Sequence, residues 1–213
     1  KAPPTRYAQG AENVRVHKAT GRVVPRGKRQ TDGGVMWNNV TTRASIGRFL
    51  KTGMPLVKRR FTVSGDAIAR PCNANIIIGT RLRDVMEFAG LTKEPHKVVL
   101  GGPMMGNAQI DMDYPVIRQN NGVLVFSKDA MEQPATTACI RCGRCTNSCP
   151  MQLSPIAIKK AYTVQDAKKL DDLMADLCMG CGTCSFVCPA KQPLAQTSKL
   201  ARDSMRAEMA RRG

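Results

Sequence analysis

The sequence predicts an α+β fold in which a small β-rich domain is followed by a helical, cysteine-rich domain. Two observations lead to this expectation. Eight of the nine cysteines fall within residues 139–188, in two runs of identical spacing. Ahead of them, residues 58–126 hold several short apolar stretches of strand length around one amphipathic helix. The 213 residues are enough for one or two domains of roughly 100–200 residues each.

The cysteines follow one pattern, C-x₂-C-x₂-C-x₃-C-P, written twice. The first run is Cys139, Cys142, Cys145 and Cys149, and the second is Cys178, Cys181, Cys184 and Cys188. In bacterial ferredoxins with this spacing, three cysteines of a run wrap one cluster and the fourth reaches the other cluster. We therefore expect one [4Fe–4S] cluster on Cys139, Cys142, Cys145 and Cys188, and a second on Cys178, Cys181, Cys184 and Cys149.

Zinc sites and disulfides explain the cysteines less well. Zinc sites use pairs of ligands with a long spacer between the pairs, which differs from a run of four. A disulfide framework needs a secreted context, and nothing in the sequence indicates one. The ninth cysteine, Cys72, stands alone, and we expect it to be a small apolar filler.

The chain is strongly basic, with a formal net charge of +17. Such a surplus favours a polyanionic partner: nucleic acid, an anionic membrane surface, an acidic protein or a phosphorylated cofactor. Aromatic residues make up only 4% of the chain, which leaves few rings to stack on bases and argues against nucleic acid. No apolar run approaches the ~20 residues of a membrane-spanning helix. Residues 1–6 are not expected to open a signal peptide.

Residues 1–57 are predicted to hold a strand–turn–helix unit, which is half of an α/β domain and is too short to bury a core alone. Val35–Trp37 is typical of a buried strand. Thr41 or Thr42 is expected to cap the helix that follows, and Gly53 is expected to end it.

Residues 58–126 are predicted to form a small β-grasp domain. The expected strands are Phe61–Val63, Ala74–Ile78, Val98–Leu100 and Val123–Phe126. A helix is expected from its cap, Thr80, to Gly90. Its apolar side would carry Leu82, Val85, Met86 and Ala89.

Residues 127–138 are predicted to be a linker, and residues 139–213 to form the two-cluster domain. Helices are expected to open at Ser154-Pro155 and at Thr163-x-x-Asp166, the second running to Leu177. A basic helix over residues 194–212 would have as its apolar members Leu194, Leu200, Met205 and Met209.

Five motifs follow one another in a fixed order. They are Tyr7–Glu12 (YAQGAE), Asn38–Val40 (NNV), Thr62–Asp66 (TVSGD), Gly101–Gly106 (GGPMMG) and the paired cysteine runs. This set resembles the C subunit of the Rnf electron-transport complex, a family similar to the 51-kDa flavoprotein of respiratory complex I. The resemblance implies that residues 1–57 are the C-terminal part of a flavin- and NADH-binding domain. It also implies that residues 58–126 are a SLBB (soluble-ligand-binding β-grasp) domain and residues 139–213 a two-cluster ferredoxin domain.

The resemblance also implies a function. Members of the family are oxidoreductase subunits that take electrons from NADH through FMN to membrane partners, which drive ion pumping and exchange electrons with ferredoxin. The implied cofactors are two [4Fe–4S] clusters, with FMN and NADH in the complete protein. One side of the FMN site would be lined by Gly10, Glu12, Asn38 and Asn39. The implied partners are the other subunits of a membrane-bound complex at the cytoplasmic face, where the basic residues would meet acidic subunits or anionic headgroups.

One part of the family pattern is missing. Family members carry a glycine-rich flavin segment ahead of the first motif, whereas residues 1–57 hold no G-x-G-x-x-G. The chain would then be a piece of a longer protein, or a second polypeptide would supply the rest. Two alternatives stay open: a cobalamin-reducing flavoprotein of propanediol-degrading microcompartments, which has the same layout, and a nucleic-acid-binding iron–sulfur protein. The run Cys139–Cys145 and the tail Pro193–Gln196 look more like the Rnf family.

Overall fold

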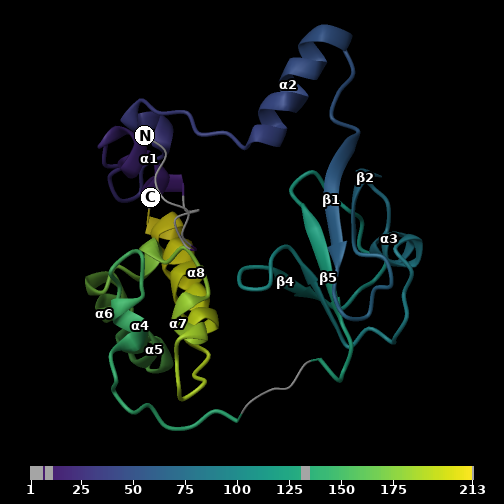
Figure 1. Cartoon of the computed structure of the whole chain (residues 1–213). Helices are drawn as coiled ribbons and strands as arrows, with labels where there is room; N and C mark the ends of the chain where they lie inside the picture. Colours follow the sequence, from purple (N-terminus) through teal and green to yellow (C-terminus); the bar gives the residue numbers. More distant parts are fainter. Residues whose placement is uncertain (1–6, 8–11, 131–134, 213) are drawn as a thin grey trace. The chain divides into compact units, whose positions relative to one another are not determined.

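The computed structural model describes residues 7, 12–130 and 135–212 (Figure 1). These residues form two compact units, which are described separately. One unit combines the described residues of Lys1–Trp37 with those of Pro134–Gly213, and the other lies within Asn38–Gln133. The domain boundaries expected from the sequence, after residues 57, 126 and 138, stay predictions. Among the described residues, no helix is both long enough and apolar enough to cross a membrane.

The second unit is built on a five-stranded mixed sheet. Its strands are β1 (Lys58–Ser64), β2 (Cys72–Ile77), β3 (Lys97–Leu100), β4 (Asn107–Gln109) and β5 (Gly122–Phe126). Their order is β2-β1-β5-β3-β4, in which β1 and β5 run parallel and the other neighbours run antiparallel. The four strands expected from the sequence are confirmed, and β4 was not foreseen.

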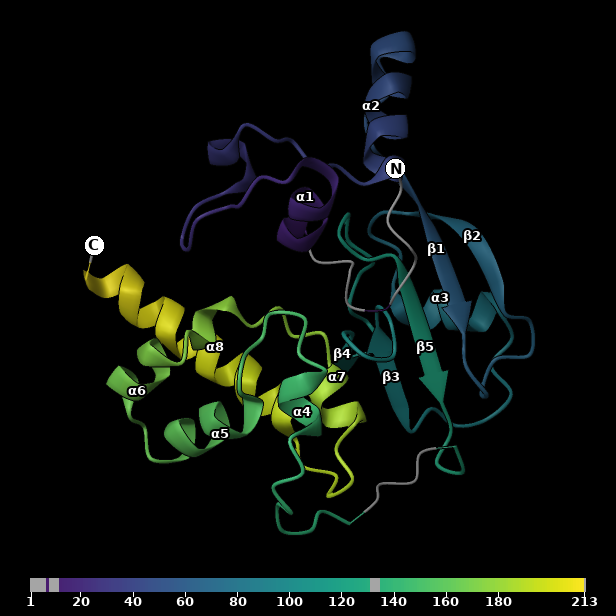
Figure 2. The same ribbon diagram turned by 60° about the vertical axis from the view of Figure 1, so that its left-hand side comes forward.

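Helix α3 (Leu82–Phe88) lies against one face of this sheet (Figure 2). Leu82, Val85 and Met86 are buried there in one core with side chains of the central strands. These strand residues are Phe61, Val63, Val98, Leu100, Val123 and Val125. A crossing helix over a parallel central pair of strands is the β-grasp arrangement, which confirms the prediction. The expected cap was wrong, because Arg81 rather than Thr80 precedes the helix.

The turn after β1 requires a glycine. Gly65 has φ +127°, and a Cβ atom on it would lie 1.9 Å from the carbonyl oxygen of Val125. The Asp66 carboxylate accepts hydrogen bonds from the Ser127 backbone N–H (3.0 Å) and from its hydroxyl. The hydroxyl contact is the main reason that the pKa of Asp66 is lowered. The Gly-Asp pair therefore fastens the end of β1 to β5.

Helix α2 (Val40–Thr52) was correctly expected, and Gly53 ends it with φ +69°. Its cap was not correctly expected, because the Asn39 side chain accepts from the Thr41 N–H at 2.8 Å. The predicted buried strand Val35–Trp37 was wrong: the segment has no regular secondary structure, and Met36 is 71% exposed. No described residue pairs with this segment as a strand, so its β-propensity has no sheet to join.

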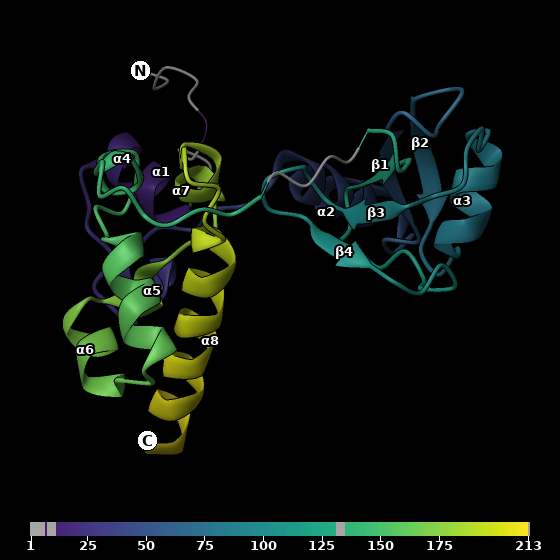
Figure 3. The ribbon, with the colours of Figure 1, turned by 90° about the horizontal axis from the view of Figure 1, so that it is seen from below.

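The first unit is helical. Its elements are α1 (Glu12–Thr20), η1 (Gln30–Gly33), α4 (Arg144–Asn147), α5 (Pro155–Thr163), α6 (Ala167–Asp172), η2 (Ala175–Leu177), α7 (Thr183–Phe186) and α8 (Leu194–Arg212). Figure 3 shows α5 and α8 packed side by side. As expected, α5 opens at Ser154-Pro155.

The predicted helix from Thr163 to Leu177 was wrong as one element. Thr163 ends α5, and Asp166 caps a shorter helix, α6, by accepting from the Lys169 N–H at 2.9 Å. Met174, with φ +50°, then separates α6 from η2.

Helix α8 was correctly expected, but only two of the four apolar residues predicted for its buried side are buried. Leu194 and Met205 are buried, whereas Leu200 and Met209 are exposed. The buried side is completed by Ser198 and Ala201. These four positions follow the helical period of 3.6 residues, so the side that faces the unit carries a serine and an alanine where larger residues were expected.

Candidate metal centre

The two cysteine runs have matching backbones. Each run passes through a glycine in the left-handed conformation, Gly143 or Gly182, into a four-residue helix that carries its third cysteine. Three residues after the fourth cysteine, Gln152 and Lys191 both have positive φ. The longer helices α5 and α8 then begin at the same distance from each run. The sequence repeat is therefore a structural repeat.

The repeat brings a cysteine of the first run to those of the second. Cys178, Cys181 and Cys184 line one cavity together with Cys149. The rest of its lining is largely apolar and includes Met151, Leu153, Pro155 and Ile158. The crossed ligand arrangement expected from the spacing requires these four cysteines to lie together, and their role as ligands stays a prediction. We call these four cysteines the second cysteine set.

The chemistry of this cavity fits an iron–sulfur cluster. Burial, with the neighbouring Cys178 and Cys181, raises the pKa of Cys184 to about 12. Burial likewise raises the pKa of Cys178, against the lowering effects of a hydrogen bond from the Gly180 N–H and the charge of Arg202. Sulfurs gathered in such a place become thiolates when cations bind them, and the iron ions of a cluster are such cations.

A buried hydroxyl also lines this cavity. Ser198 of α8 is 2% exposed, and its Oγ has no hydrogen-bond partner among the described residues. An unpaired buried hydroxyl is costly, so it points to a hydrogen-bond acceptor supplied by a bound group.

The described residues hold no three His, Cys, Asp or Glu side chains placed to bind a single metal ion. A four-iron cluster requires a different geometry, because each of its cysteines binds a different iron. The cysteine sulfurs are therefore further apart than those around a single metal ion.

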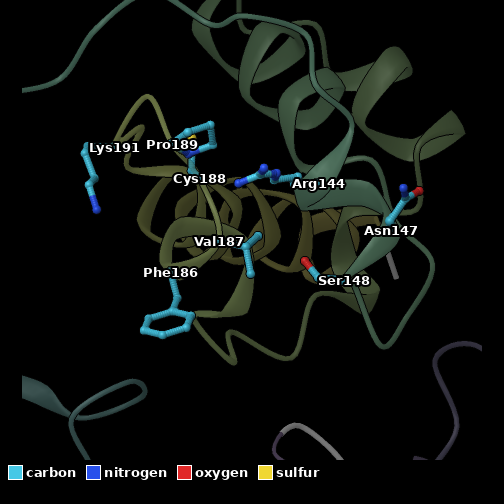
Figure 4. Close-up of a pocket in the computed structure, with 8 residues that line it drawn as sticks. All are labelled: Arg144, Asn147, Ser148, Phe186, Val187, Cys188, Pro189 and Lys191. Carbon is cyan, nitrogen blue, oxygen red and sulfur yellow. The ribbon is translucent and has the colours of Figure 1, made fainter.

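The first cysteine set, Cys139, Cys142, Cys145 and Cys188, is more open. Cys139 and Cys142 are exposed, whereas Cys145 and Cys188 are half-buried. Cys188 lines an open groove of about 610 Å³ between α4 and α7. Figure 4 shows Arg144, Asn147 and Ser148 on one side of this groove and Phe186, Pro189 and Lys191 on the other. The two sets therefore differ in their access to solvent.

Two arginines of α8 reach the backbone beside the second cysteine set. Arg202 Nη1 donates to the carbonyl of Cys178 at 3.1 Å. Arg206 Nη2 donates to the carbonyl of Asp176 at 3.3 Å. These contacts place two positive charges next to a site whose bound cluster and thiolates would be net negative.

The N-terminal part of the first unit is fastened to the same region. Arg26 Nε donates to both carboxylate oxygens of Asp176, at 2.9 and 3.0 Å, and its Nη2 donates to Asp171 at 2.7 Å. The hydrogen bond to Asp176 is the main reason that the pKa of Arg26 is raised. The Tyr7 hydroxyl donates to the carbonyl of Cys181 at 2.5 Å. Sequence reasoning missed these contacts, because none of them belongs to a local pattern.

The described residues expected at a flavin site belong to two different units. Gly10 lies outside the described residues. Glu12 is exposed at the start of α1 and accepts from Gln30 Nε2 at 2.5 Å. Asn39 caps α2, and Asn38 is half-buried beside it. Glu12 belongs to the first unit, and the two asparagines belong to the second.

The ninth cysteine belongs to the unit that contains the sheet. Cys72 is half-buried on β2 and packs against the core of the sheet, as an apolar filler would.

Comparison with known families identifies both domains. Residues 138–192 match the 4Fe-4S dicluster domain, and residues 60–108 match the SLBB domain. Both matches agree with the domains that the motifs implied.

The chain is similar to the C subunits of several ion-translocating oxidoreductase complexes. The chain is 42% identical over 153 residues to the C subunit of the proton-translocating ferredoxin:NAD(+) oxidoreductase complex of Clostridium ljungdahlii, covering 71% of this chain and 34% of that protein. It is 41% identical over 155 residues to the C subunit of the Na(+)-translocating ferredoxin:NAD(+) oxidoreductase complex of Acetobacterium woodii, covering 72% and 35%. The C subunit of the ion-translocating oxidoreductase complex of Pseudomonas aeruginosa is 38% identical over 156 residues, covering 72% and 20%. The matched stretch is about a third or less of each relative's length.

Proposed function

We propose, from the partial homology of this chain to the C subunits of ion-translocating oxidoreductase complexes, that it carries electrons through two [4Fe–4S] clusters. The observation that carries the proposal is the meeting of Cys149 with Cys178, Cys181 and Cys184 at one cavity. We assign the second cluster to these four and the first cluster to Cys139, Cys142, Cys145 and Cys188. Such clusters, when bound, accept and release single electrons.

The chain's own residues would hold and tune the second cluster. The N–H groups of Gly180 and Ser185 donate hydrogen bonds toward the sulfurs of Cys178 and Cys184, which favours the thiolate form of both. The apolar lining limits contact with water, and Arg202 offsets negative charge. Hydrogen bonds, charge and burial are the features by which a protein sets a cluster's reduction potential.

The wider role follows from what the relatives are called. In the complete protein, electrons would pass between NADH, FMN and these clusters, and Gly10, Glu12, Asn38 and Asn39 would contribute to the FMN site. The other subunits of the complex would be the direct partners, at the cytoplasmic face of a membrane. Ferredoxin would be an indirect partner, and the electron transfer would be coupled to ion transport. Support comes from the names of the relatives, which are complexes acting on ferredoxin and NAD(+) and translocating protons or Na(+).

Exchanging single cysteines tests the crossed ligand sets. Cys149→Ser should impair the cluster held mainly by the second run, because it removes the ligand that completes that set, whereas Cys188→Ser should impair the cluster of the first run. Electron paramagnetic resonance of each dithionite-reduced variant separates the two signals. Cys72→Ser is the matched control, since this cysteine lies on β2, and should leave both signals intact.

Two results would contradict the assignment. If Cys149→Ser abolished only the signal that Cys142→Ser also abolishes, the ligands would not be crossed. If the reconstituted wild-type chain showed no reducible cluster at all, the electron-transfer proposal itself would fail.

A further inference from the structure

The stretches of the chain that hold the two cysteine sets carry only positive charge. Residues 134–165 and 177–202 contain all eight cysteines of the two sets and not a single Asp or Glu. The same stretches carry Arg141, Arg144, Lys159, Lys160, Lys191, Lys199 and Arg202. Some positive charge here would balance the clusters and their thiolates, as Arg202 does beside Cys178. Other cations in these stretches are exposed to solvent, and their role needs a separate explanation.

Arg144 and Lys191 are such cations. Both are exposed and line the groove beside Cys188, from opposite sides (Figure 4). Among the described residues, neither side chain forms an ion pair or hydrogen bond. Arg141, exposed within the first cysteine run, adds a third positive charge to the loop.

Large apolar side chains are exposed among these cations. Phe186, in the groove lining, is 74% exposed, and Ile140, which follows Cys139, is 67% exposed. Arginine and aromatic residues are enriched where proteins dock, relative to the rest of the surface. We call Ile140, Arg141, Arg144, Phe186 and Lys191 the cationic face.

We propose that the cationic face is the docking surface for an acidic electron-carrier protein, and that the first cluster exchanges electrons with it. The proposal rests on the proposed function and adds the place of exchange and the charge of the partner. Two cysteines of the first set are exposed, whereas in the second set two are buried and two are half-buried. The first cluster is therefore the one that a docked carrier can approach.

The transfer is a one-electron step. The reduced first cluster returns to its oxidised state, and the carrier protein is reduced by the same electron. In the opposite direction the carrier is oxidised and the cluster reduced. The step transfers no proton to or from the chain's side chains, and it forms and breaks no covalent bond in them.

An acidic protein fits this face better than the other polyanions or a second copy. A second copy would bring another formal charge of +17 and be repelled. Lipid headgroups and nucleic acid could also meet the cations, but neither brings a redox centre to the exposed Cys139 and Cys142, as an electron-carrier protein does.

Charge reversal tests the proposal with flavodoxin, an acidic carrier protein, as the probe. The variant Arg144→Glu/Lys191→Glu is compared with Lys160→Glu/Lys168→Glu, which makes the same change in net charge on exposed residues outside the face. At low salt, the face variant should lower the rate constant of electron transfer to flavodoxin about tenfold or more, because steering and docking are both lost. Calorimetric Kd values for oxidised flavodoxin should rise in parallel. The control variant should stay within about threefold of the wild type, and the difference should shrink as salt is added.

The outcomes separate this inference from the proposed function. Dithionite-reduced resonance spectra of both variants should match the wild type, which shows that the clusters are intact. If spectra match and the two variants transfer electrons equally fast, the docking surface is elsewhere. If the face variant loses binding to vesicles of anionic phospholipid while flavodoxin binding persists, the face is a membrane contact and the proposal is overturned. Absence of reducible clusters in the wild type would instead refute the proposed function.

A second observation carries an independent inference about Ser198. Its hydroxyl is buried, has no hydrogen-bond partner among the described residues, and lines the cavity of the second cysteine set. The geometry points to Ser198 Oγ as a hydrogen-bond donor to a sulfur of the second cluster. Such a bond stabilises the reduced, more negative cluster and so raises its reduction potential.

Potentiometric titration followed by paramagnetic resonance tests this role. Ser198→Ala should make the midpoint potential of the second cluster more negative, whereas Ser198→Thr, which keeps the hydroxyl, should restore it. The first cluster in the same sample is the internal control and should not shift. An unchanged second-cluster midpoint in Ser198→Ala, with both signals present, would refute the assignment.

Discussion

Gly65 and Asp66 show how single residues in a recognisable motif can serve the fold. A side chain at Gly65 would meet the backbone of Val125 at 1.9 Å, and Asp66 binds both donors of Ser127. Gly106, in another motif, would place a Cβ atom 2.6 Å from the carbonyl oxygen of Gly102. Both motifs therefore have a structural explanation within the SLBB domain. The cysteine runs are the part of the pattern with a chemical role.

Two glycines with positive φ allow the cost of a steric clash to be distinguished from the cost of backbone strain. Gly65 lies against the backbone of Val125, whereas nothing lies close to the position that a Cβ atom on Gly79 would take. Gly65→Ala should destabilise the SLBB domain by more than about 4 kcal/mol, because β5 must move away. Gly79→Ala should cost only about 1–2 kcal/mol, because φ is +101° there but nothing lies within 4 Å. Amide hydrogen exchange in β1 and β5 should accelerate strongly in the first variant and slightly in the second. Equal acceleration in the two would show that the contact with Val125 is unimportant.

At the scale of elements, the first unit is stabilised by the buried sides of its helices, which pack against one another. The ion pairs of Arg26 also stabilise it. Arg26 joins the segment between α1 and η1 to Asp171 at the end of α6 and to the buried Asp176 of η2. Buried carboxylates need such partners, because an unpaired buried charge is strongly destabilising. The N-terminal segment therefore belongs structurally to the cysteine-rich unit, as its division from the sheet after Trp37 also indicates.

The repeated elements also explain why the two cysteine sets differ. The second set lies beneath α5 and α8, and Ser198 and Arg202 of α8 reach it. The first set lies by α4 and α7, which are one turn long and cover little surface. The two cysteine loops therefore have unequal environments, because the long helices α5 and α8 cover the second cysteine set and leave the first set open.

At the scale of the whole molecule, this chain corresponds to one part of longer relatives. It matches 20–35% of their length, and its two identified domains are the SLBB and dicluster domains. The proposed flavin residues would supply a surface beside the ring. Phosphate binding generally needs a glycine-rich loop at a helix N-terminus, and residues 1–57 offer no such sequence.

Flavin titration of the 213-residue chain tests this division of roles. With its clusters rebuilt, the chain should bind FMN weakly or not at all and fail to oxidise NADH, while dithionite still reduces both clusters. Fluorescence quenching measures FMN binding, and NADH-dependent reduction of an artificial acceptor measures turnover. The control is the chain joined to the preceding segment of the Clostridium ljungdahlii relative, which should restore both properties. Tight, stoichiometric binding of FMN by the chain alone would contradict the expectation.

The sequence by itself determined the features that depend on local spacing and period. The cysteine runs predicted the dicluster domain, and short apolar stretches predicted the strands β1, β2, β3 and β5. Ser154-Pro155 predicted the start of one helix, and Gly53 predicted the end of another. Each of these follows from neighbours within a few residues, whose backbone geometry the residue types restrict directly.

Only the tertiary structure decided features that depend on distant partners. The strand expected at Val35–Trp37 did not form, because a strand needs a neighbour to complete its hydrogen bonds. The Arg26–Asp176 pair joins residues 150 positions apart, and no local pattern predicts such a contact. The burial of Ser198 and the exposure of Arg144 likewise depend on how α8, α5 and α4 pack. Spacing could therefore predict which cysteines bind the clusters. Solvent access and the unpaired hydroxyl were decided by packing, because burial is a property of the assembled helices.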